Sequence, residues 1–188
     1  KILGKNSFHI FDSVENASIR TYHEKIENIK NALYNNEFVL YYQPKVNMKT
    51  GETVGLEALI RWNHPINGVM APGEFLPILN GHTFSIAIGE WVIEETIKHI
   101  EQWKTLGFNF IVNINIDAIH LLQGNILEYI KTLFLKYPKV NSNDFKLEIL
   151  ETSALEDITQ VVQVMEDCNQ FGISFSRDDF GTGYSSLT

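Results

Sequence analysis

Hydrophobic and polar residues follow two different periods along this chain, and the period changes from segment to segment. Apolar and polar residues alternate in short stretches that predict strands at Glu37–Val46, Thr53–Trp62, Phe110–Ile116, Phe145–Leu150 and Ile173–Asp178. Between the later strands, apolar residues recur at helical spacing and predict helices over Phe84–Leu106, along the stripe from Ile119 to Leu133, and from Ile158 up to Gly172. Strands that alternate with helices favour an α/β fold with parallel strands and right-handed crossovers.

The first two strands depart from this alternation. Only the turn sequence Lys49-Thr50-Gly51-Glu52 separates their central parts, so we expect them to form an antiparallel hairpin. A loop rich in Pro and Gly is predicted to follow, from Asn63 to Gly73.

A helix is predicted ahead of the hairpin, where Asp12 and Ser13 can cap its start. One apolar stripe runs along it and ends near Asn35; its members are Ile19, Tyr22, Ile26, Ile29 and Leu33. Two interpretations fit this stripe: it packs on its own domain, or it forms the seam of a homodimer.

Each later strand carries one unexpected polar residue among apolar ones. These residues are Glu57, Asn113 and Glu148, and Asp178 ends the last strand. Side chains alternate between the two faces of a strand, so if the apolar sets pack under helices, the polar sets point together toward the middle of a barrel. Converging carboxylate and amide oxygens suit Mg²⁺ or Mn²⁺. Arg61 shares the face of Glu57 and could hold a phosphate.

Asp178 and Asp179 stand side by side before a Gly-x-Gly turn. Adjacent carboxylates repel each other when both are ionised, and a divalent metal is the strongest counter-charge that keeps them so. A solvated Asp-Asp turn is the alternative interpretation.

The composition narrows the function classes. The chain has 188 residues, room for one ordinary domain or the larger part of a bigger one, and a hydrophobic content of 44%. A net charge of −8 argues against binding a nucleic-acid polymer, but it allows a small phosphate ligand. Cys168 is the single cysteine, which fits a reducing cytoplasm. The chain contains no membrane segment, although a membrane anchor upstream of Lys1 would not be visible.

These motifs resemble a known family. Glu57-Ala58-Leu59 followed by Ile60-Arg61-Trp62 is similar to the motif that names the EAL domain, the cyclic-di-GMP phosphodiesterase domain. The family's other blocks are resembled, in order, by Tyr42-Gln43-Pro44, Asn63-His64-Pro65, Val112-Asn113-Ile114, Leu147-Glu148-Ile149 and Asp178-Asp179-Phe180-Gly181-Thr182-Gly183-Tyr184-Ser185-Ser186-Leu187. Residues 1–12 faintly resemble the last strand of a GGDEF domain. The resemblance therefore divides the chain into a GGDEF tail (1–12), a linker helix (13–36) and the N-terminal part of an EAL domain (37–188).

The resemblance implies an incomplete TIM-like (β/α)8 barrel whose first strand is antiparallel. It implies one metal on Glu57, Asn113, Glu148 and Asp178, and a second, Mg²⁺ or Mn²⁺ like the first, shared by Asp178 and Asp179. Glu57, Asp178 and Asp179 would serve catalysis, in which cyclic-di-GMP is hydrolysed to linear pGpG during bacterial second-messenger signalling. Gln43 and Arg61 match positions that contact the ligand. An upstream GGDEF or sensor domain and a homodimer, formed through the linker helix or the barrel, are the implied partners.

Several positions depart from the family pattern. Asn80 lacks a Glu that is usual in that loop, Asn115 replaces a common Ser, Leu150 replaces a common Thr, and Arg177 stands where an apolar residue usually does. The family's catalytic Lys, a later metal-binding Glu and about three strands would lie beyond Thr188. We therefore expect the 188-residue chain by itself to be inactive.

Three functional hypotheses follow from the sequence. The first is a metal-dependent cyclic-di-GMP phosphodiesterase, the second a receptor that binds the same dinucleotide without cutting it, and the third a structural or partner-binding module. The metal-ligand residues that can be assigned within this chain are all present, and this favours the enzyme.

Overall fold

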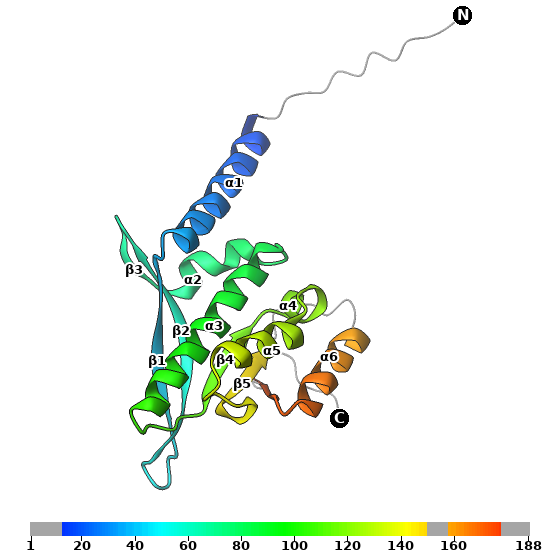
Figure 1. Cartoon of the computed structure of the whole chain (residues 1–188). Helices are drawn as coiled ribbons and strands as arrows, with labels where there is room; N and C mark the ends of the chain where they lie inside the picture. The colour runs from blue at the N-terminus through cyan, green and yellow to red at the C-terminus, as the bar shows by residue number, and fades with distance from the viewer. Residues whose placement is uncertain (1–12, 150–157, 178–188) are drawn as a thin grey trace, which may run out of the picture.

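The computed structural model describes residues 13–149 and 158–177, and their helices and strands alternate as the sequence predicts (Figure 1). In chain order the elements are α1 (Ser13–Tyr34), β1 (Phe38–Val46), β2 (Thr53–His64), β3 (Gly68–Met70), α2 (Pro72–Phe75), η1 (Leu76–Leu79), α3 (Phe84–Thr105), β4 (Val112–Ile116), α4 (Ala118–Gln123), α5 (Ile126–Lys136), η2 (Ser142–Asp144), β5 (Phe145–Ile149), α6 (Ile158–Gln170) and β6 (Ser174–Arg177). The strand predicted within residues 1–12 lies outside the described residues.

The strands form one six-stranded sheet in the order β1-β2-β4-β5-β6, with the short β3 on the far part of β2. The β1–β2 hairpin is antiparallel, whereas β2, β4, β5 and β6 run parallel to one another. Helix α3 packs on β4 and α5, and α5 packs on α6, so these helices cover one face of the sheet (Figure 1). This arrangement confirms the predicted mixed α/β fold with an antiparallel first strand.

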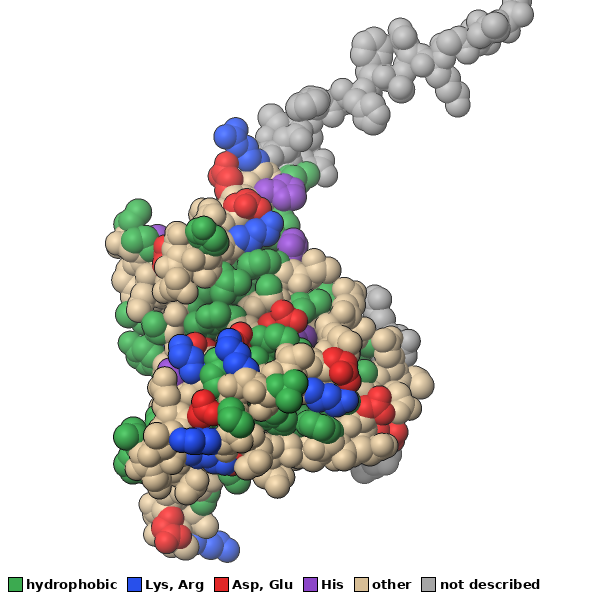
Figure 2. Space-filling view, viewed as in Figure 1, with side chains coloured by type: hydrophobic (Ala, Val, Ile, Leu, Met, Phe, Trp, Pro, Cys, Tyr) green, Lys and Arg blue, Asp and Glu red, His purple; other side chains and the backbone are tan. Residues whose placement is uncertain are grey.

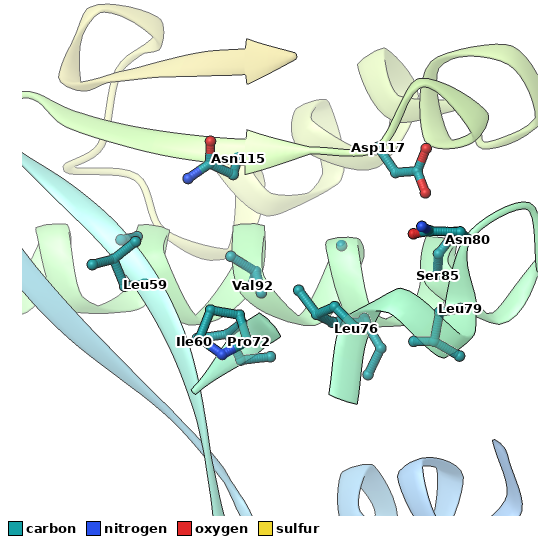
Figure 3. A pocket seen from close by; sticks show the side chains of 13 residues that line it. Leu59, Ile60, Pro72, Leu76, Leu79, Asn80, Ser85, Val92, Asn115 and Asp117 are labelled. Carbon is teal, nitrogen blue, oxygen red and sulfur yellow. The ribbon is translucent and has the colours of Figure 1, made fainter. Parts of the chain in front are cut away.

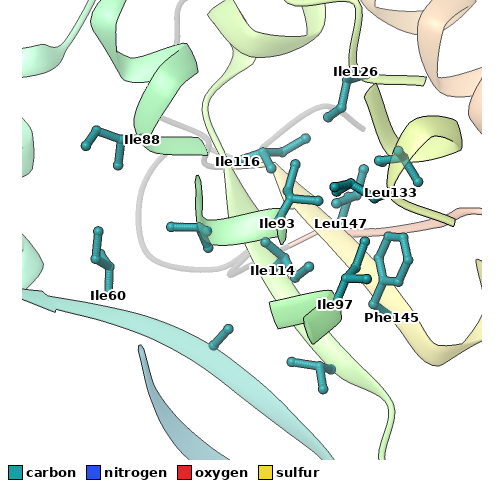
Figure 4. Packing of buried hydrophobic residues seen from close by; sticks show 14 of the residues in the cluster. Ile60, Ile88, Ile93, Ile97, Ile114, Ile116, Ile126, Leu133, Phe145 and Leu147 are labelled. Carbon is teal, nitrogen blue, oxygen red and sulfur yellow. The ribbon is translucent and has the colours of Figure 1, made fainter. Parts of the chain in front are cut away.

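The core lies between this helix layer and the sheet. Its fully buried side chains come from both sides of the interface: Ile93, Ile97 and Ile126 from helices, Ile114, Phe145 and Leu147 from strands (Figure 4). Burying each such side chain contributes about 1.5–3 kcal/mol. On the face seen in Figure 2, acidic and basic side chains are interspersed.

The prediction of a single helix between β4 and β5 is wrong in one respect, because the structure has two helices there. Helix α4 ends at Gln123 and α5 begins at Ile126, with Gly124 between them. The His120 ring packs against this point, since a Cβ added at Gly124 would lie 2.5 Å from His120 Cδ2. The apolar stripe runs through both helices, so periodicity alone does not reveal the break.

The Pro- and Gly-rich loop also holds more structure than predicted. Strand β2 continues to His64, and β3 pairs with its end. Residues Pro72–Phe75 and Leu76–Leu79 then form two short helical turns. The residue types in this stretch predict only turns. Its strand and helical turns form because β3 pairs with β2 and Phe75 packs in the core.

Helix α1 packs on its own domain through its C-terminal half. Ile26 and Ile29 are buried in the common core, and Ile19, nearer the start of the helix, is 49% exposed. The packing interpretation therefore holds for Ile26 and Ile29. Among the described residues, no helix is both long and apolar enough to cross a membrane.

Gly55 sets how closely β4 approaches β2. The Leu56 N–H donates to the Ile111 carbonyl oxygen over 2.8 Å, and a Cβ added at Gly55 would lie 2.9 Å from the same oxygen. The obstacle is backbone, which cannot move aside without shifting β4. This close approach brings Glu57 opposite Asn113 in the sheet.

Gly55→Ala should therefore lower the free energy of unfolding by about 1–3 kcal/mol, because the new methyl group forces β2 and β4 apart. Urea unfolding followed by circular dichroism measures this change. The matched control is Gly73→Ala, where an added Cβ has no atom within 4 Å. Equal stability of the two variants would contradict the close-approach argument.

Candidate functional site

Polar side chains gather on the face of the sheet opposite the helices. Ala58, Ile114 and Leu147 are buried in the core under the helices, so their neighbours along each strand point to the other face. We call this other face the inner face. The polar residues that the described strands place on it are Gln43, Lys45, Glu57, Arg61, Asn113, Asn115, Lys146, Glu148, Ser174 and Ser176.

The strand register brings the predicted ligand residues together. Glu57 on β2 lies opposite Asn113 on β4, and Glu148 on β5 lies beside Asn115 on β4 and Ser176 on β6. Parallel strands hold such neighbours about 4.8 Å apart. Three residues predicted from separate strands therefore lie in one patch of the inner face.

Glu148 is the most densely contacted member of this patch. Its side chain is 4% exposed, and its Oε1 accepts hydrogen bonds from Lys45 Nζ at 2.8 Å, Ser176 Oγ at 2.8 Å and Asn113 Nδ2. Its other oxygen, Oε2, is buried and has no hydrogen-bond partner among the described residues. A buried carboxylate oxygen without a partner is costly, so Oε2 is suited to a further donor or a cation.

The contacts of Glu148 determine its charge state. Burial by itself raises the pKa of this carboxyl, but the hydrogen bonds from Lys45, Ser176 and Asn113, together with the Lys45 charge, leave the pKa below its usual value. Glu148 is therefore ionised at neutral pH.

Sequence reasoning did not single out Lys45, although the two-residue period places it on the same face as Gln43. Its strand, β1, is separated from β5 by β2 and β4. A flat sheet would hold β1 and β5 about 14 Å apart, at about 4.8 Å per strand. The direct contact between Lys45 and Glu148 is made because the sheet curves toward its inner face, as the wall of a barrel does.

Glu57 is held in place by Asn115, the next inner-face residue after Asn113 on β4. Asn115 Nδ2 donates to Glu57 Oε1 over 2.9 Å. The Asn115 Oδ1 is buried and has no hydrogen-bond partner among the described residues. Asn115 thus fixes one carboxylate of the patch and leaves a free acceptor beside it.

Gln43 and Arg61 lie at the edge of the patch. Gln43 is directly opposite Glu57 in the hairpin, and its side chain is exposed. Arg61 donates to the Ile60 carbonyl oxygen over 2.8 Å, and its guanidinium lies 5.5 Å from the centre of the Tyr41 ring. No carboxylate of the described residues pairs with Arg61.

The structure does not describe the remaining predicted site residues. Asp178 and Asp179 fall outside the described residues, as does Leu150, and so do the side-chain contacts of Arg177 at the end of β6. Within residues 13–149 and 158–177, no group of three or more His, Cys, Asp or Glu side chains is placed to hold a metal ion.

A cavity of about 220 Å³ lies where β2 and β4 diverge beyond their paired residues (Figure 3). Its wall is mainly apolar, with Asn80, Ser85, Asn115 and Asp117 as the polar members. Asn115 also bonds Glu57, so it connects the cavity with the carboxylate patch. Asn80 contributes an uncharged amide to this wall, whereas Asp117 contributes a carboxylate.

Comparison with known proteins identifies the family. The EAL domain profile matches residues 26–188. The chain belongs to the EAL domain family. The bifunctional diguanylate cyclase/cyclic di-GMP phosphodiesterase MucR of Pseudomonas aeruginosa is 32% identical over 185 residues, and the cyclic di-GMP phosphodiesterase PdeR of Escherichia coli is 31% identical over 185 residues. Each match covers 98% of this chain, but the chain spans only 27% and 28% of the length of these relatives.

Solved EAL structures share the fold. The MucR phosphodiesterase in complex with c-di-GMP matches with a TM-score of 0.77 and 32% identity, over 87% of this chain and 66% of that one. The EAL enzyme Bd1971 in its cGMP-bound form matches with a TM-score of 0.80 and 30% identity, over 92% and 48% of the two chains. EAL domains are TIM-like barrels, and the curved sheet described above corresponds to part of such a barrel wall.

The lowered pKa of Glu148 predicts a pH-dependent contribution to stability. A carboxyl whose pKa falls on folding stabilises the protein above the usual value of 4.5, and this contribution is lost as the pH drops through the folded-state pKa. Glu148→Gln should therefore unfold more easily at pH 7, by about 1–3 kcal/mol. The deficit should shrink below pH 4.5 in thermal unfolding across pH.

The control for this prediction is Glu128→Gln, which removes an exposed carboxylate paired with Lys131 on α5. Exposed pairs contribute about 0–1 kcal/mol, so this variant should follow the wild type closely. A deficit of Glu148→Gln that stays constant from pH 7 to pH 3 would refute the assigned charge.

Proposed function

We propose that the protein carrying this chain hydrolyses cyclic-di-GMP to linear pGpG in the bacterial cytoplasm and requires Mg²⁺ or Mn²⁺. The observation that carries the proposal is the inner-face patch, where Glu57, Asn113 and Glu148 adjoin one another on parallel strands. The 32% identity to a phosphodiesterase solved with c-di-GMP supports the choice of substrate.

The residues present fit a hard divalent cation. The patch offers carboxylate and amide oxygens, and the buried Glu148 Oε2 lacks a partner among the described residues. Glu57 and Glu148, with Asn113, would hold one ion together with Asp178, and Asp178 with Asp179 would hold a second. Bound ions of this kind lower the pKa of a coordinated water and neutralise charge that develops on a phosphodiester.

The other residues of the inner face would orient the reacting groups. Asn115 holds Glu57 through its amide, so the carboxylate keeps one direction. Arg61 uses one donor on the Ile60 carbonyl oxygen, and a guanidinium has five, so others remain for a phosphate. Gln43, exposed opposite Glu57, can donate or accept a hydrogen bond to the same ligand.

The domain arrangement of the whole protein stays a prediction. We propose a GGDEF or sensor domain upstream of α1, and a homodimer through α1 or the barrel; the exposed Ile19 on α1 is available to such a contact. Activity is expected from the complete barrel and not from residues 1–188 alone, because a closed barrel fixes the inner-face side chains from all sides.

Glu57→Gln should reduce hydrolysis of cyclic-di-GMP by at least about a hundredfold, since the amide keeps the shape but loses the charge that binds a cation. The full-length protein is assayed with Mn²⁺ by chromatography of the products. The control is Glu52→Gln, an exposed glutamate in the turn of the same hairpin, which should retain activity.

Full turnover by Glu57→Gln, or by wild-type protein in excess chelator, would overturn the metal-dependent mechanism. Binding of cyclic-di-GMP by a wild-type protein that never cleaves it would instead assign the receptor function.

Arg61→Ala should weaken cyclic-di-GMP binding by about tenfold or more, because it removes charge-assisted hydrogen bonds to phosphate. Calorimetric titration in the presence of chelator measures the ligand without hydrolysis, and a separate Mn²⁺ titration should be unchanged. Arg20→Ala, which removes an exposed arginine paired with Glu24 on α1, is the matched control. A weaker affinity for Mn²⁺ with an unchanged affinity for the dinucleotide would reverse the role of Arg61.

A further inference from the structure

Lys45 is a partly exposed cation that contacts the buried Glu148, and the proposed function gives it no role. Its Nζ lies 2.8 Å from Glu148 Oε1, and its side chain is 35% exposed while that of Glu148 is 4% exposed. Among the described residues, it is the one cation paired with Glu148. The other ion pairs described, such as Lys131 with Glu128, lie on helices away from the inner face.

The two oxygens of Glu148 have very different surroundings. Among the described residues, Oε1 receives all three donors, from Lys45, Asn113 and Ser176, and Oε2 receives none. Asn113 and Ser176 are neutral, so Lys45 supplies the charge that balances the buried carboxylate. Without a cation, an isolated buried carboxylate is strongly disfavoured.

We propose that Lys45 is a resident counter-ion of Glu148 that orients this carboxylate before a divalent cation binds, and that it competes with this cation for Glu148. The inference rests on the proposed metal site and adds a residue that sets the affinity of that site. Lys45 is suited to this role because its partial exposure lets the ammonium withdraw into water as a second cation arrives.

Competition follows from charge. A divalent ion that approaches Glu148 meets a carboxylate already neutralised by an ammonium, and it is repelled by that ammonium at short range. Removing the lysine charge should therefore have opposite effects on two measurable properties: the metal-free fold becomes less stable, and the metal binds more tightly. A lysine that serves only to stabilise the fold would change the first property and not the second.

The test uses the full-length protein with Lys45→Met, which keeps the length of the side chain without its charge. Lys45→Gln is the second variant, because its amide can still donate to Glu148 Oε1 if the methionine variant fails to fold. Lys98→Met is the control, since Lys98 pairs with Glu95 on α3 and its loss changes the net charge equally. Mn²⁺ alone is titrated into chelator-treated protein by calorimetry, and melting temperatures are recorded with and without Mn²⁺.

We expect both Lys45 variants to melt at a lower temperature than the control without metal, and to bind Mn²⁺ at least about tenfold more tightly. Their gain in melting temperature on adding Mn²⁺ should exceed that of wild type. If the wild-type protein binds Mn²⁺ and hydrolyses cyclic-di-GMP but the Lys45 variants bind Mn²⁺ equally or more weakly, the Lys45 proposal alone would be overturned. Failure of wild type and every Lys45 variant to bind Mn²⁺ would overturn both it and the proposed metal site.

Discussion

The negative charge of Glu148 is held almost entirely out of water, and the inner face of this protein is arranged around that charge. Burial disfavours an ionised carboxylate, so the surrounding side chains must supply what water would have supplied. Lys45 provides a positive charge, and Asn113 and Ser176 provide neutral donors. These partners come from β1, β4 and β6, and the contact network therefore depends on the sheet keeping its register and its curvature.

The register in turn depends on the opposite face. Ile114 and Leu147 are fully buried beneath the helices, and a slip of one residue in β4 or β5 would turn them toward the inner face and send Asn113 and Glu148 into the core. The hydrophobic core and the polar patch are thus two consequences of the same alternation. Gly55 adds a constraint of its own, because the backbone of β4 passes too close to accept a side chain there.

The EAL family relationship and the inner-face geometry are separate observations, and both support the same candidate site. The family match rests on similarity along residues 26–188. The geometry adds two contacts that the family match does not describe: Asn115 reaches Glu57, and Lys45 reaches Glu148. Both contacts concern how a carboxylate is oriented and charged, which is the property that a cation site needs most.

The sequence by itself determined the order of the long strands and helices, the antiparallel hairpin, and the face on which Glu57, Asn113 and Glu148 lie. These follow from periods of two and of 3.6 residues that are local to each segment. It could not determine that Lys45 meets Glu148, since these residues are 103 positions apart and three strands apart in the sheet, and only curvature of the sheet joins them. The break between α4 and α5 is of the same kind, because it depends on where the His120 ring packs. Periodicity fixes which way a side chain points from its own strand or helix, and tertiary structure alone decides what it meets there.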